Sequence, residues 1–171
     1  MARLSRSSTR DFKLRMGRLF GEEQYCSCRL EIAKDSIIYE SGEPGATIYF
    51  IRKGRVELLL PGTAGPDFPL SSRSEGDIFG EPCLSGRLTR LENAVALEDT
   101  ILEEMPASTF LSALREDGLL EYFVRYLTTC LGEECQIIES LALRGSGFRC
   151  ADASPSPKPV LFQLFPKEEP A

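Results

Sequence analysis

The 171-residue sequence contains no histidine and no tryptophan. Histidine is the side chain that most often transfers protons near neutral pH, and it is the commonest nitrogen ligand for protein-bound metal ions. Its absence excludes catalytic triads that use histidine, metal centres built on histidine, and enzymes of the cupin type, whose metal site normally uses histidines. We therefore expect no enzyme, no catalytic residue and no metal site.

Basic residues and long apolar runs are also scarce. There are 20 basic against 26 acidic residues, so the net charge is −6 and the chain as a whole presents no basic field suited to nucleic acid. No run approaches the roughly 20 apolar residues that a bilayer-spanning helix needs. The first residues also lack the apolar core of a secretory signal. The sequence predicts a cytoplasmic protein without a membrane partner.

The cations gather at the start of the chain. Residues 1–18 contain only one acidic residue, Asp11, beside six basic ones: Arg3, Arg6, Arg10, Lys13, Arg15 and Arg18. We expect residues 1–28 to form a basic, partly helical arm. Its apolar side chains would pack on the rest of the protein: Phe12, Leu14, Leu19 and Phe20. A membrane-binding or nucleic-acid-binding arm is the alternative.

Six cysteines are present, and without a secretory signal we expect them to be reduced. They are Cys26, Cys28, Cys83, Cys130, Cys135 and Cys150. The Cys-x-Cys pair at Cys26 and Cys28 lacks the spacing with which two thiolates commonly hold a tetrahedral metal ion. The simplest role for the six cysteines is to serve as small, buried apolar side chains. A thiol-based redox-sensing or metal-sensing module is the alternative function.

Eight short apolar segments, separated by turn residues such as Lys53-Gly54, predict strands between residues 29 and 117. The expected strands are Arg29–Ala33, Ser36–Glu40, Thr47–Arg52, Arg55–Leu60, Phe68–Ser72, Asp77–Phe79, Leu91–Leu97 and Asp99–Met105. The short turns suit antiparallel neighbours. The fold class is therefore α+β, with an antiparallel, jelly-roll-like β-roll of about eight strands over residues 29–117.

Helices follow the predicted roll. A short helix is expected from Pro106 to Leu114, and a long one within residues 118–144. The long helix carries a heptad seam, for which we predict pairing with the same helix of a second copy: Leu120, Val124, Leu127, Leu131, Glu134, Ile138 and Leu141. A second stripe is predicted to pack on the roll: Leu119, Phe123, Tyr126, Cys130 and Ile137. A monomer with one wide core face is the alternative. Residues 145–171 are rich in proline, predict a disordered tail, and contain no helix-turn-helix pattern.

Residues 79–97 (FGEPCLSGRLTRLENAVAL) are the most informative stretch. A strand ends at Gly80, a short helical turn would expose backbone N–H groups, and Arg87 and Arg90 follow before a strand resumes. Free N–H groups near a guanidinium form a cradle for an anion. The pattern predicts a site for a small anionic effector.

The chain resembles the cyclic-AMP receptor/fumarate–nitrate regulator family of bacterial transcription factors. The resemblance covers residues 29–149 and rests on residues 48–56 (IYFIRKGRV), Phe79-Gly80-Glu81, Ala94-Val95-Ala96 and residues 138–142 (IESLA). It implies a dimer formed through the long helix and an effector bound between roll and helix. The implied effector contacts are Gly80, Glu81, Arg87, Arg90, Asn93, Ala94, Cys130 and Glu134.

Three departures from the family pattern change the expected ligand and partners. Glu92 and Asn93 stand where the phosphate-binding arginine of cyclic-nucleotide binders is expected, and a carboxylate there would repel a phosphate. Cyclic nucleotide is therefore disfavoured, and no cofactor is expected. The cysteine run of the iron–sulfur branch is not reproduced. Because no DNA-reading module follows the long helix, we expect DNA contact only through a partner, such as a heterodimer with a full-length relative.

Overall fold

The computed structural model describes residues 3–25, 27–62 and 65–145. Its helical elements are α1 (Arg3–Leu19), the short 3-10 turns η1 (Glu23–Tyr25) and η2 (Glu81–Ser85), α2 (Ala107–Glu116) and α3 (Leu120–Gly145). The predicted tail (residues 145–171), Cys26 and Cys150 lie outside these residues, apart from Gly145, which ends α3. None of the helices described is both long and apolar enough to cross a membrane.

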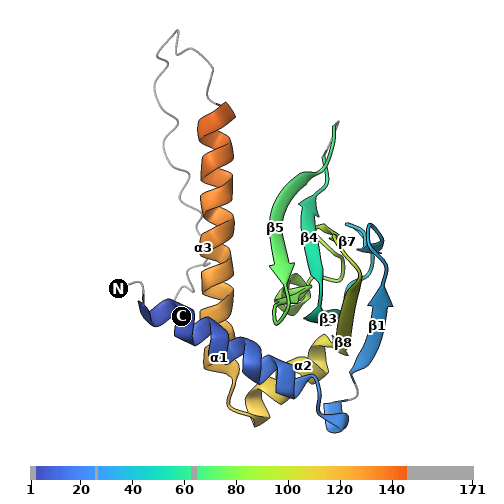
Figure 1. The fold of residues 1–171 in the computed structure, drawn as a ribbon, viewed down its shortest axis with the longest axis vertical. Coiled ribbons are helices and arrows are strands. Elements are labelled where there is room, and N and C mark those ends of the chain that lie inside the picture. Colours follow the sequence, from blue (N-terminus) through green and yellow to red (C-terminus); the bar gives the residue numbers. More distant parts are fainter. Residues whose placement is uncertain (1–2, 26, 63–64, 146–171) are drawn as a thin grey trace, which may run out of the picture.

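Two four-stranded antiparallel sheets form the predicted roll (Figure 1). One has the order β1-β8-β3-β6 and the other the order β2-β7-β4-β5. The strands are β1 (Cys28–Ile32), β2 (Ile37–Tyr39), β3 (Thr47–Lys53), β4 (Arg55–Leu60), β5 (Phe68–Ser74), β6 (Ile78–Phe79), β7 (Asn93–Ala96) and β8 (Thr100–Pro106). The α+β class and all eight predicted strands are confirmed, with bounds that differ by a residue or two because strand ends are set by partner strands rather than by local pattern.

Strand β3 explains why the roll has apolar cores on both sides of one sheet. Its side chains alternate between the two faces, as in any strand. Tyr49 and Ile51 point into the roll, in one cluster of buried residues, whereas Ile48 and Phe50 belong to the cluster that packs under the helices. The run Thr47–Lys53 therefore lacks the polar alternation of a strand with one wet face.

Helix α1 packs across α3 and beside β3, as Figure 1 shows. Phe12, Leu19 and Phe20 are buried as predicted. The prediction for Leu14 was wrong, because its side chain is 58% exposed. Leu14 lies about 200° around the helix from Phe12, since successive helical residues turn by about 100°, so it faces away from the roll.

Helix α3 has two different faces. Leu119, which directly precedes α3, and Phe123, Tyr126 and Cys130 within it are buried in the core beneath the roll and α1, as predicted for the second stripe. Exposed apolar side chains lie along another face: Leu120, Val124 and Leu131. Leu127 is only partly buried and packs on the core. The side chains of Ile137, Ile138 and Leu141 lie outside the described residues.

Candidate functional site

The candidate site is built on residues 79–97, called the cassette below. Gly80 directly follows β6, has a φ of 85° and precedes η2. A Cβ at this position would lie 2.8 Å from Arg90 Nη1 and 3.0 Å from the Thr47 carbonyl oxygen, so only glycine fits both the conformation and the space. The predicted strand end and short helical turn are therefore present.

Arg90 turns into the protein instead of facing solvent. Arg90 is buried, with 6% of its surface exposed to solvent. Nη1 donates to the carbonyl oxygens of Thr47 at 3.1 Å and Gly80 at 3.3 Å, and Nη2 donates to Thr47 Oγ1 at 2.8 Å. The guanidinium carbon lies 4.3 Å from the ring centroid of Tyr39 and 5.3 Å from that of Tyr49. The guanidinium of Arg90, one of the predicted anion-binding groups, is thus directed at the protein's own acceptors.

The other cassette residues have separate surroundings. Glu92 is buried, and one of its carboxylate oxygens accepts a 2.9 Å hydrogen bond from the Tyr39 hydroxyl. Burial, followed by the Glu92 charge, raises the pKa of that hydroxyl. Asn93 accepts a bond from the Ser41 N–H at 2.7 Å and donates to Asp67 at 2.6 Å. Ala94 is fully buried in β7, and Arg87 is exposed.

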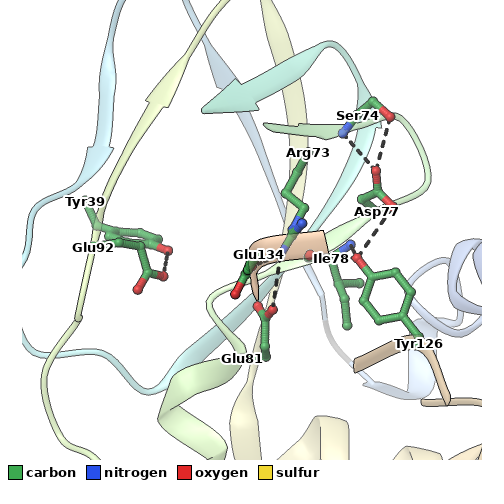
Figure 2. A network of polar contacts seen from close by, with 9 residues as sticks. All are labelled: Tyr39, Arg73, Ser74, Asp77, Ile78, Glu81, Glu92, Tyr126 and Glu134. Atoms are coloured by element: carbon green, nitrogen blue, oxygen red, sulfur yellow. Dashed lines mark hydrogen bonds and ion pairs between the residues drawn. The ribbon is translucent and has the colours of Figure 1, made fainter. Parts of the chain in front are cut away.

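A buried arginine links the cassette to α3. Arg73, on β5, is 3% exposed. Its Nη2 atom lies 2.7 Å from Oε1 of Glu134 on α3 and 3.8 Å from Oε1 of Glu81 in η2. Figure 2 shows the guanidinium between the two carboxylates. Glu134 therefore contacts its own roll, although it occupies a position of the predicted dimer seam. Its pairing with a second copy stays a prediction.

The surroundings of the Glu81 carboxyl shift its pKa. Burial raises its pKa to about 7, although the Arg73 guanidinium acts in the opposite direction. Its Oε2 atom is buried without a hydrogen-bond partner among the described residues. The charges of Glu92 and Glu134 also raise the pKa. Glu81 is therefore a group whose protonation responds readily to what lies beside it.

Tyr126 and Asp77 join the same region to α1. The Tyr126 hydroxyl accepts a bond from the Ile78 N–H at 3.3 Å and lies 3.2 Å from the Ile78 carbonyl oxygen (Figure 2). Asp77 pairs with Lys13 of α1 at 2.9 Å. A small, partly open cavity of about 160 Å³ lies beside these groups, bounded also by Arg73 and Cys130. Three elements distant in sequence thus meet around one polar cluster.

The four cysteines that the structure describes, Cys28, Cys83, Cys130 and Cys135, show no arrangement that favours the sensing alternative. Cys130 is buried, and burial raises the pKa of its thiol, which makes the reactive thiolate scarcer. Cys28 and Cys135 are exposed. In the ranges that the structure covers, no three cysteine or carboxylate side chains gather where they could hold a metal ion.

Four residues of the site were not predicted as site residues, namely Arg73, Tyr39, Asp77 and Lys13. Arg73 lies in a strand rich in serine, where no periodic pattern shows which face is buried. Arg90 was predicted, but as a donor to a ligand. Of the predicted residues, the structure brings Gly80 and Arg90 together, and separately Glu81 and Glu134, while Arg87 stays exposed. The only feature of the sequence that could have drawn attention to Arg73 is that it is the single basic residue of a predominantly uncharged strand.

Comparison with known proteins places the cassette within a known protein family. The family model described as the cyclic nucleotide-binding domain matches residues 29–117. The global nitrogen regulator of Nostoc sp. (strain PCC 7120) is 29% identical over 119 residues, which are 68% of this chain and 53% of that protein. The cyclic AMP receptor protein of Thermus thermophilus is 31% identical over 85 residues, which are 50% of this chain and 39% of that protein.

The crystal structure of Thermus thermophilus catabolite activator protein has the same fold, with a TM-score of 0.61 and 24% identity, over 74% of this chain and 58% of that one. The chain spans about half or less of the length of the curated relatives it matches. The matched family model covers more than half of the chain, and it includes the whole roll and the cassette apart from part of β1. This chain belongs to the cyclic nucleotide-binding domain family, with homologues among the regulators of the cyclic-AMP receptor/fumarate–nitrate regulator type.

Proposed function

We propose that this chain is the effector-sensing part of a transcriptional regulator of that type, and that it acts as a homodimer formed through α3. In this function the cassette receives the signal and Arg73 passes it to α3. The observation that supports the proposal is the contact of Arg73 with both Glu81 and Glu134. These two carboxylates belong to the cassette and to the helix, which are the two parts that a sensor has to couple.

The coupling follows from the cost of burying a charge. A guanidinium that is 3% exposed needs carboxylate or other acceptor partners, because removing one partner leaves an uncompensated buried charge. A ligand or proton that neutralises Glu81 shifts the balance of Arg73 toward Glu134. The position of α3 relative to the roll then depends on the state of the cassette, as in other two-state switches.

The exposed face of α3 supports the dimer. Leu120, Val124 and Leu131 are 43%, 54% and 61% exposed, and their spacing of four and seven residues places them on one stripe. Pairing this stripe with a second copy would bury all three side chains. A heterodimer with a longer relative would use the same stripe and is an alternative outcome of the test.

Light scattering and hydrogen exchange together test the function. We expect twice the monomer mass for the wild type and the monomer mass for Val124→Asp, whereas Leu88→Asp, at an 83% exposed position on the roll, stays dimeric. In the dimer, Arg73→Met should speed amide exchange of residues 130–136, whereas Arg125→Met, at an exposed position of the same helix, should not. A monomeric wild type would refute the dimer. Unchanged exchange in Arg73→Met would refute the coupling.

A further inference from the structure

A groove of about 430 Å³, called the α1 groove below, lies between α1, β3 and the turn that joins β5 to β6. One side of α1 lines it, together with residues 50–52 of β3 and with Glu75 and Gly76 of the turn. These lining residues belong neither to the cassette nor to α3. The α1 groove is therefore separate from the parts of the molecule that the proposed function uses.

Two ion pairs hold the walls of the α1 groove in place. Lys13 of α1 pairs with Asp77 at 2.9 Å, and its aliphatic carbons lie so close to Gly76 that a Cβ there would come within 3.1 Å of Lys13 Cδ. On the floor, Arg52 pairs with Glu103 of β8 at 2.6 Å. The groove is preformed, so a ligand does not have to order its walls on binding.

Two other cations that line the α1 groove lack such partners. Arg10 and Arg18 are exposed, and no carboxylate among the described residues lies within ion-pair distance of either. The two guanidinium groups stay unneutralised although residues 19–171 contain 25 acidic against 14 basic residues. Of the lining residues that the structure describes, one, Glu75, is acidic. The groove therefore carries a net positive charge on an acidic chain.

An exposed leucine lies midway between the two arginines. Leu14 is 58% exposed and is four residues from both Arg10 and Arg18, so the three form one stripe that rises about 6 Å at each step. Alternate residues of an extended chain also point to one side, about 6.6–6.8 Å apart. An extended segment of the pattern acid-x-apolar-x-acid would place one carboxylate at each guanidinium and its apolar side chain on Leu14.

This stripe favours a protein segment over a membrane or a nucleic acid, the partners considered for the basic arm from its sequence. Phe12 and Met16 are 1% and 0% exposed, so α1 lacks the free apolar face with which an amphipathic helix enters a membrane. Nucleic acids are bound mainly through cations at successive phosphates, whereas here an apolar side chain separates the cations.

We propose that the α1 groove binds an extended acidic segment of a partner protein, in which two carboxylates flank one apolar residue. The carboxylates pair with Arg10 and Arg18, and the apolar side chain covers Leu14. Helix α1 then has two roles, because one of its faces completes the core and the other is an interaction surface. This inference goes beyond the proposed function, since neither the cassette nor the dimer takes part in it.

A titration with a synthetic peptide, followed by two-dimensional NMR of the isotope-labelled protein, tests the proposal. The peptide GSESLSESG should shift the amide signals of residues 10–18, 50–52 and 75–76. Its dissociation constant at low salt should be about 1 mM or below, as expected of two exposed ion pairs and one apolar contact. The peptide GSSEELSSG has the same composition with adjacent glutamates. It should bind about threefold more weakly, because one of its carboxylates is out of reach of an arginine.

Variants of exposed residues assign the binding to the α1 groove. Arg10→Gln and Arg18→Gln should each weaken the binding of GSESLSESG about threefold, and the double variant about tenfold. Leu14→Ala should weaken it about threefold through the lost apolar contact. Arg115→Gln, at an exposed position of α2, changes the net charge by the same amount as either single arginine variant and should leave binding unchanged.

Several results would overturn the proposal. They are equal binding of the two peptides, unchanged binding in the double arginine variant with a folded circular dichroism spectrum, and shifts confined to other residues. A short DNA duplex or phosphatidylglycerol vesicles that perturb the same amides more strongly than the peptide would also overturn it, because the surface would then belong to a nucleic acid or a membrane.

Discussion

Replacing Glu81 by glutamine should change how the stability of this protein depends on pH. Burial raises the Glu81 pKa to about 7 in the folded protein, from 4.5 in an ordinary environment. Between these values the folded protein holds a proton that the unfolded chain releases. The contribution of Glu81 to the free energy of unfolding is therefore fully present below pH 4.5 and is lost as the pH rises through 7.

The structure gives the size of this effect. A pKa difference of about 2.5 corresponds to about 3 kcal/mol in the free energy of unfolding. About 2 kcal/mol of this falls between pH 5.5 and 8.5, a range that lies above the pI of 4.9. Glutamine resembles the protonated carboxyl and cannot titrate, so Glu81→Gln should lack this loss.

The assay is urea unfolding at pH 5.5, 7 and 8.5 under reducing conditions, followed by circular dichroism because the chain has no tryptophan. The urea midpoint of Glu81→Gln relative to the wild type should rise by about 1 M over this range, for a slope of about 2 kcal/mol per molar urea. Glu75→Gln, at an exposed turn, should follow the wild type. A difference between Glu81→Gln and wild type that stays constant with pH would refute the burial argument. A difference of opposite sign would show that the Arg73 charge outweighs burial.

Two further predictions concern α1 and the cysteines. Phe12 is 1% exposed and stacks on Tyr126 at 4.4 Å, so Phe12→Ala should lower the free energy of unfolding by about 3–5 kcal/mol. Leu14→Ala on the exposed side of the same helix should cost less than about 0.5 kcal/mol, and equal costs in urea unfolding would contradict the packing of α1. Alkylation at pH 7.5, resolved by peptide mass spectrometry, should modify exposed Cys135 about tenfold or more faster than buried Cys130. Similar rates would mean that α3 does not shield Cys130.

How much could be predicted differs between parts of the molecule. The two stripes of α3 follow from a period that one helix imposes on its own sequence, so the burial of Phe123 and Tyr126 was predictable. The exposure of Leu14 was not, because α1 has apolar residues on more than one side and only its contact with α3 and β3 selects the buried one. The sequence positions of helical residues predict which of them share a face, but they do not predict which face packs against the rest of the protein.

The sequence alone determined the roll, the order of its strands along the chain, the long helix and the cassette, because these depend on local periodicity and turn residues. Only the tertiary structure decided what the cassette's charges do. Arg90 turns inward because Tyr39, Tyr49 and Thr47 from two other strands meet Gly80 around it. Arg73 bridges β5, η2 and α3 for the same reason. A buried charge takes its role from the partners that surround it, and here folding supplies partners from distant parts of the chain.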